Sequence, residues 1–189
     1  FGLSGTGSQD YQVNKQIVLN SHIFRHDTKT PLRGGKTFSC GIVTVMLTGH
    51  IGVALGLAEQ LLRDLQTLTK IARRSGQLNE RDDFLIELGR QKASLFAAKA
   101  FSEKALRCTD NAALKNEVKQ DDHDKIRMVA IHVTEISRSI ARFAFDYSGM
   151  NGASNDSNIN KLFRDVHVAS QHLLVNSSQY KSIMKRMIG

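Results

Sequence analysis

The chain has 189 residues, of which 41% are hydrophobic, enough to bury one good core and a small appendage. Its formal net charge of +8 raises the question of nucleic acid, yet the basic residues are scattered and tryptophan is absent. We therefore expect these charges on solvated helix faces, and no nucleic-acid partner. Apolar runs are broken before they reach the roughly 20 residues of a membrane span, so no membrane partner is expected.

Cysteine usage bears on the cellular compartment. The two cysteines, Cys40 and Cys108, show no paired spacing, which is typical of a reducing cytoplasm. The first residues do not have the pattern of a signal peptide, which also favours a cytoplasmic location. Because the chain begins at Phe1 rather than at a methionine, we expect it to be a piece of a longer protein.

The pattern of the chain changes once, near residue 38. Residues 1–38 are rich in glycine, serine and threonine, carry short alternating runs and contain the single proline, Pro31. This pattern predicts the end of a β-sheet region. From residue 39 to residue 189 the apolar residues recur at helical spacing, which predicts a helical domain.

The helical part divides into four amphipathic helices and a short last one. The patterns predict them over 39–74, from a cap at Asn79, over 121–150, over 159–175, and from Ser177 to near Ile188. In the first helix the predicted inward residues are Met46, Val53, Leu57, Leu61, Leu65 and Leu68, and close backbone contact is the expected reason for Gly49, Gly52 and Gly56.

The third predicted helix has the most regular pattern. Its apolar residues follow steps of three and four: Ile126, Val129, Val133, Ile136, Ile140 and Phe143. Such a seam is typical of packing against nearly antiparallel neighbours. The sequence therefore predicts a mainly α fold, an antiparallel four-helix bundle, preceded by a short β remnant. Helices of this length bury more surface than one monomer offers, so we also expect self-association.

One stretch of the fourth predicted helix, LFRDVHVASQHLL over 162–174, is the main candidate for chemistry. On a continuous helix, Asp165 and His172 lie together on the half-buried flank of the apolar stripe. An imidazole near a carboxylate can titrate near neutral pH, which makes His172 a candidate acid or base. The competing interpretation is a structural histidine, which is the commoner role for a single histidine.

The sequence does not support a metal-binding site or a phosphate-binding loop. Glu-x-x-His, which a di-iron bundle needs on two helices, does not occur, and cysteines and histidines are not clustered as in a zinc site. We therefore expect no metal. The segment GLSGTG at 2–7 lacks the Lys-Ser or Lys-Thr that follows a phosphate-binding loop, and we expect it to be a turn between strands.

Three segments together resemble the acyl-CoA dehydrogenase superfamily: FGLSGTGSQDYQV at 1–13, GHIGVALGLAEQLL at 49–62 and FRDVHVASQH at 163–172. The resemblance covers essentially the whole chain. It is closest to the oxygenase branch, the two-component flavin-dependent monooxygenases that hydroxylate aromatic rings. It implies that 1–38 is the end of the central β-domain, and that 39–189 is the C-terminal helical bundle, which builds a homotetramer.

The absence of a glutamate at the positions where dehydrogenases carry their catalytic base favours the oxygenase branch. Dehydrogenases of this superfamily use a glutamate base near the end of the chain or near the start of the first bundle helix. This chain has no glutamate after Glu135 and no acid between Asp27 and Glu59. The oxygenase branch instead carries a histidine seven residues after the Arg-Asp pair, as His172 follows Asp165. The resemblance therefore implies that His172 is catalytic.

The resemblance also implies a cofactor and partners. The cofactor would be reduced flavin, FMN or FAD, delivered by a separate flavin reductase, and the substrate an aromatic, phenolic compound. Arg73 and Arg74 would contact the flavin phosphate. The front half of the flavin site has no counterpart here, so this chain alone is expected to be inactive. Two alternatives stay open: an acyl-CoA dehydrogenase-like protein whose base lies in the missing portion, and a non-catalytic helical oligomerisation module.

Overall fold

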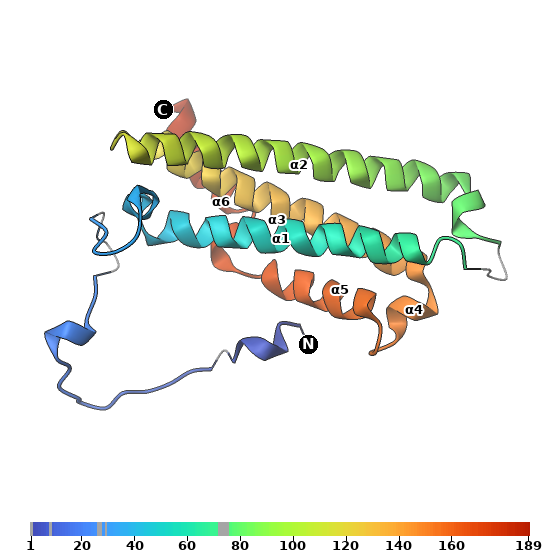
Figure 1. Cartoon of the computed structure of the whole chain (residues 1–189), viewed down its shortest axis with the longest axis horizontal. Coiled ribbons are helices and arrows are strands. Elements are labelled where there is room, and N and C mark those ends of the chain that lie inside the picture. Colours follow the sequence, from blue (N-terminus) through green and yellow to red (C-terminus); the bar gives the residue numbers. More distant parts are fainter. Residues whose placement is uncertain (1, 8, 26–27, 29, 72–75) are drawn as a thin grey trace.

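The computed structural model describes residues 2–7, 9–25, 28, 30–71 and 76–189. Four helices make up most of the described chain: α1 (Ile42–Thr67), α2 (Asp82–Leu114), α3 (Gln120–Ser148) and α5 (Asn158–Ala169). Successive helices of this set run in alternating directions (Figure 1). Helix α3 contacts the other three helices, and α5 packs against both α1 and α3. The mainly α class expected from the sequence is confirmed.

Short elements connect these helices and end the chain. They are the helices α4 (Met150–Ala153) and α6 (Gln179–Ile188), and the 3-10 turns Ser4–Thr6, Asn20–His22, Lys36–Cys40, Leu78–Glu80 and Leu173–Val175. Asn79 lies inside one of these turns and does not cap α2, which begins at Asp82. The side chain of Arg186, on α6, binds the buried carboxylate of Asp124 near the start of α3 with two hydrogen bonds of 2.5 and 3.0 Å.

The fourth predicted helix is two elements rather than one. Helix α5 ends at Ala169, and after a turn the chain forms the separate 3-10 turn Leu173–Val175. The hydroxyl of Ser170 donates to the carbonyl of His167 at 2.8 Å, so a side chain bonds one of the last carbonyls of the helix. Serine side chains compete in this way with helical hydrogen bonding, and the helix stops here. His172 therefore lies outside α5.

The core follows the seam of α3. Ile126, Val129, Val133, Ile140 and Phe143 are buried, and Ile136 is half-buried, as the sequence predicts. On α2, Gln91 is buried in the apolar stripe because its amide is satisfied: it donates to Glu87 at 2.7 Å and to Ser139 at 3.1 Å. A buried amide that keeps its hydrogen bonds costs little.

The predicted inward face of α1 is wrong in its first half. Met46 and Val53 are each 52% exposed, and the buried residues there are Leu47, Ile51 and Ala54. This half of the helix is apolar on nearly every side, so spacing alone does not select a face. The expected backbone contact at its glycines is also wrong within this chain. A Cβ built on Gly49, Gly52 or Gly56 meets no atom within 4 Å.

Helix α1 is also long and apolar enough, by length and composition alone, to cross a membrane. Core helices of soluble proteins can pass the same test; α1 packs against α3, and 28% of its most apolar stretch is buried. Its Glu59 carboxylate binds Lys99 of α2 at 2.6 Å and Arg63 of its own helix at 2.7 Å. The absence of a membrane partner stays a prediction.

The segment before α1 forms an arm that leaves the bundle and returns at its start toward α5 (Figure 1). Its described residues, up to residue 38, contain turns and extended backbone but no strand. A strand needs the backbone hydrogen bonds of a neighbouring strand, and the described part of this chain offers none. The strands expected over 1–38 are therefore not formed here, and the assignment of this segment to a β-domain stays a prediction.

Candidate active site

His172 lies three residues beyond α5, exposed, at the start of the turn Leu173–Val175. Its Nδ1 accepts the backbone N–H of Leu174 at 3.3 Å. A ring nitrogen that accepts a hydrogen bond carries no proton, so in the neutral ring the proton is assigned to Nε2. The expected pairing of His172 with Asp165 on one helix flank is wrong, because the helix ends between them.

His50, near the middle of the first half of α1, shares a cavity with His172. The cavity measures about 190 Å³ and is lined by the two histidines together with Met46, Leu47, Leu174 and Val175. No carboxylate is among the described residues that line it. The site therefore combines two imidazoles with apolar walls, and it joins the start of the chain's first long helix to the segment after α5.

Thr134 of α3 fixes the orientation of His50. Its Oγ1 lies 2.8 Å from Nε2 of His50. The same hydroxyl donates its single proton to the carbonyl of Ala130 at 2.7 Å. With that proton donated to Ala130, we assign the hydroxyl as the acceptor from His50 and the ring proton of His50 to Nε2. In the neutral ring, Nδ1 is then a free acceptor.

The surroundings favour the neutral form of His50. Burial lowers its pKa, because an imidazolium loses hydration inside the protein, and positive charge on His172 lowers the pKa further. Both causes act in the same direction. At neutral pH the His50 ring is therefore uncharged, and its two nitrogens have distinct roles: Nε2–H as a donor to Thr134, and Nδ1 as an acceptor.

A second cavity, of about 490 Å³, lies where the start of the chain meets α5. It is lined by the turn at Leu3–Thr6 and by Lys161, Arg164 and Asp165. The Asp165 carboxylate accepts the backbone N–H of Leu3 at 2.6 Å. A Cβ on Gly2 would overlap the carbonyl of Arg164, so the close approach of the two backbones requires glycine here.

Two expectations about ligands are not tested by the structure. Arg73 and Arg74, the expected flavin-phosphate contacts, lie outside the described residues. Within the described residues, no group of three His, Cys, Asp or Glu side chains is placed to hold a metal ion. The absence of a metal stays a prediction, as does the catalytic role of His172.

His50 and Thr134 were missed by the sequence analysis. In the sequence, His50 is only a polar interruption of an apolar run, and Thr134 lies beside the seam of α3. One signal was available: a lone histidine in an apolar helix is half-buried and needs a polar partner. The identity of that partner depends on how α1 and α3 pack, which the periodicity does not reveal.

Comparisons with known proteins place these residues in a family. Residues 48–177, which include His50, Thr134 and His172, match the family described as acyl-CoA dehydrogenase, C-terminal domain. The chain is 24% identical to the indole-3-acetate monooxygenase of Pseudomonas putida over 203 aligned positions, which cover 96% of this chain and 47% of that protein.

Two solved structures share the fold. XiaF from Streptomyces sp., solved in complex with FADH2 and glycerol, has a TM-score of 0.72 at 16% identity, covering 84% of this chain and 41% of that one. The 3-HSA hydroxylase from Rhodococcus sp. RHA1 has a TM-score of 0.53 at 16% identity, covering 78% and 39%. The chain spans less than half the length of these relatives. Because the family match extends over more than half of the chain, the chain belongs to the family of acyl-CoA dehydrogenase C-terminal domains.

Proposed function

We propose that the protein carrying this chain is a flavin-dependent monooxygenase, which uses reduced flavin and O₂ to hydroxylate an aromatic, phenolic substrate. The named relatives support this function: one is an indole-3-acetate monooxygenase, one a hydroxylase, and one was solved with FADH2. The cavity between His50 and His172 supports this function most directly, because the described residues that line it are imidazoles and apolar side chains and include no carboxylate base.

The flavin, when bound, supplies the oxygen chemistry, and the residues of this chain supply its surroundings. The Nε2–H of His172 is a hydrogen-bond donor suited to an oxygen atom that gains negative charge. The side chains of Met46, Leu47, Leu174 and Val175 give the cavity its apolar walls. Such walls exclude water, which limits the loss of oxidising equivalents as peroxide.

The second cavity has cationic side chains in its lining, which suit a phosphate of the flavin. Lys161 and Arg164 line the cavity beside the glycine-rich turn at the start of the chain, and cationic side chains next to backbone N–H groups suit a phosphate. We keep Arg73 and Arg74 as proposed phosphate contacts across a subunit boundary, as the resemblance implies. A separate reductase is the proposed source of reduced flavin, and the cytoplasm the proposed location.

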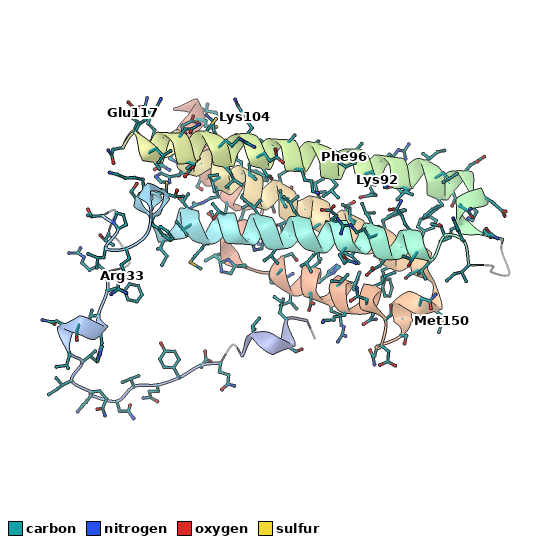
Figure 2. The ribbon with its side chains drawn as sticks, in the orientation of Figure 1. Arg33, Lys92, Phe96, Lys104, Glu117 and Met150 are labelled. Atoms are coloured by element: carbon teal, nitrogen blue, oxygen red, sulfur yellow. The ribbon has the colours of Figure 1, made fainter. Side chains whose placement is uncertain are left out.

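The open face of α1 supports self-association. Gly49, Gly52 and Gly56 leave space on this face, and Val43, Met46 and Val53 beside them are exposed. On α2, Phe96 is 65% exposed (Figure 2). Exposed apolar surface next to glycines permits close packing of a second backbone, and such patches mark interfaces. We propose a homo-oligomer, with a tetramer as the expected state.

The test is the origin of the oxygen atom in the product. The full-length protein, supplied with reduced flavin, a phenol and ¹⁸O₂, should release a ring-hydroxylated product that carries one ¹⁸O atom. His172→Ala should lose most of this product, whereas His132→Ala, a histidine of α3 outside the cavity, should retain it. Oxidation of an acyl-CoA thioester without incorporation of ¹⁸O would instead identify a dehydrogenase.

A further inference from the structure

The hydrogen-bond network around His50 leaves one ring nitrogen for a ligand. Nε2 of His50 is bonded to Thr134 in the direction of α3. The ring also lines the cavity that contains His172, so the polar atom that His50 can bring to a ligand there is Nδ1. Within the described part of the chain, Thr134 is the single hydrogen-bond partner of this ring.

His172 has the opposite arrangement. Its Nδ1 accepts from the Leu174 backbone, which leaves Nε2–H for a ligand. One histidine therefore offers an acceptor and the other a donor. In the opposite tautomers, Nε2 of His50 no longer donates to Thr134, and Nδ1 of His172 no longer accepts from Leu174. The site therefore presents one acceptor nitrogen and one donor nitrogen before a ligand binds.

We propose that His50, held by Thr134, is a second ligand-binding histidine of this site, and that it binds the same hydroxyl oxygen as His172. The ring hydroxyl of an aromatic ligand donates to Nδ1 of His50 and accepts from Nε2–H of His172. Thr134 is the positioning residue. The role of this contact in catalysis rests on the proposed function, but the binding itself does not require flavin.

The chemistry of the cavity selects among aromatic ligands. A hydroxyl group is both donor and acceptor, so it satisfies both histidines at once. An ether oxygen only accepts and an indole N–H only donates, and each leaves one imidazole nitrogen without its partner. Leaving a polar group of the site unpaired lowers affinity, because that group has given up water without a replacement. Leu47, Leu174 and Val175 line the same cavity, and their apolar side chains suit the aromatic ring of the ligand.

The test uses phenol and anisole as probes, because they differ in the hydroxyl proton. In the protein labelled with ¹⁵N-histidine, the ring nitrogens of His50 should show the Nε2–H tautomer before any probe is added. Phenol should shift the Nδ1 signal of His50 and the Nε2 signal of His172 together. Anisole should bind about 3- to 10-fold more weakly, the usual effect of one hydrogen bond, and should leave the Nδ1 signal of His50 unchanged.

Variants of Thr134 show whether its hydroxyl orients the His50 ring or whether the side chain only fills space in the core. Thr134→Val removes the hydroxyl and keeps the shape of the side chain, so His50 should populate both tautomers and phenol should bind several-fold more weakly. Thr134→Ser keeps a hydroxyl and should restore the Nε2–H tautomer and the affinity. A purely structural threonine would alter the unfolding midpoint in Thr134→Val without changing the tautomer of His50, and that result would overturn the proposal.

Variants of His50 test the contact directly. His50→Phe should abolish the preference for phenol over anisole, and His50→Gln, which keeps a donor and an acceptor, should retain part of it. An Nδ1–H tautomer in the wild-type protein, or equal binding of phenol and anisole, would contradict the proposal. Phenol binding as described in a protein that does not incorporate ¹⁸O would uphold this inference and overturn the proposed function, so the two failures are distinguishable.

Discussion

The bundle and the N-terminal arm differ in how their apolar side chains are covered. In the bundle, Leu61, Leu65 and Phe84 have no exposed surface, whereas in the arm Ile17 and Leu32 are 98% and 92% exposed. Burial of apolar surface is the main favourable contribution to folding, and the arm gains almost none of it. Helices α1 to α6 therefore contain their own core, whereas the arm has no core within the described part of this chain.

The strongest test of this comparison is a matched pair of isoleucines. Ile140→Ala in the core of α3 should lower the free energy of unfolding by about 2–5 kcal/mol, because it removes buried methyl groups and leaves a cavity. Ile17→Ala in the arm should change it by less than about 0.5 kcal/mol. Denaturant unfolding followed by circular dichroism measures both. Equal losses would show that the arm shares the core of the bundle.

The next effect concerns the attachment of α6. The Arg186 guanidinium holds the pKa of the Asp124 carboxyl below its usual value. Arg186→Ala should lower the free energy of unfolding by less than Ile140→Ala does, because Arg186 is exposed to water. The variant still leaves a buried carboxylate, whose remaining side-chain hydrogen-bond partner among the described residues is the Gln120 amide.

The sign of the pH dependence gives a control for that variant. A carboxyl group with a lowered pKa stabilises the fold above its unfolded pKa of about 3.9, and this contribution disappears as the pH falls through the folded value. The free energy of unfolding of the wild type should therefore fall faster below pH 4 than that of Arg186→Ala. Parallel curves for the two proteins would show that this ion pair does not stabilise the bundle.

A smaller, local effect is expected where the arm meets α5. Asp165→Asn weakens the hydrogen bond to the Leu3 backbone, and should cost about 1 kcal/mol of local stability. Hydrogen exchange at Leu3 should become faster while exchange in α3 stays unchanged. Gly2→Ala should have the same signature, since the added Cβ overlaps the Arg164 carbonyl. Faster exchange throughout α3 in either variant would show that the arm is part of the bundle's cooperative unit.

The smallest effect follows from His50. Its pKa is lowered in the folded protein, so the unfolded chain binds more protons between the folded value and about 6.5. The free energy of unfolding should decrease as the pH falls from about 7 through this interval. His50→Gln should remove this part of the dependence and leave the part below pH 4 unchanged. An increase in stability over the same interval would contradict the assignment of a neutral, half-buried ring.

The periodicity of apolar residues was sufficient to predict the buried side chains of a helix where one face of that helix is apolar and the other is polar. The seam of α3 is such a case, and its core residues were predicted individually. Helix α1 is apolar on most sides in its first half, so Met46 and Val53 were assigned to the wrong face. The lesson is that an amphipathic pattern locates a core only when it has a polar side to contrast with.

The candidate site was harder to predict because its parts meet through tertiary packing. His172 was found from its spacing to Asp165, yet the reason given, a shared helix flank, was wrong, because α5 ends at Ala169. His50 and Thr134 are 84 residues apart in the sequence and meet only where α1 packs on α3. No local pattern encodes that contact, and the role of each residue depends on it.

His172 is proposed to belong to the oxygen-transferring site, and the coupling ratio of the reaction tests this role. The ratio is the amount of hydroxylated product formed per reduced flavin consumed, measured in the full-length protein supplied with reduced flavin. For folded His172→Ala we expect on the order of a 10²-fold loss of product, the usual scale for a positioned acid or base, with flavin oxidation continuing as peroxide release. His132→Ala should match the wild type. Unchanged coupling in folded His172→Ala would contradict the claim.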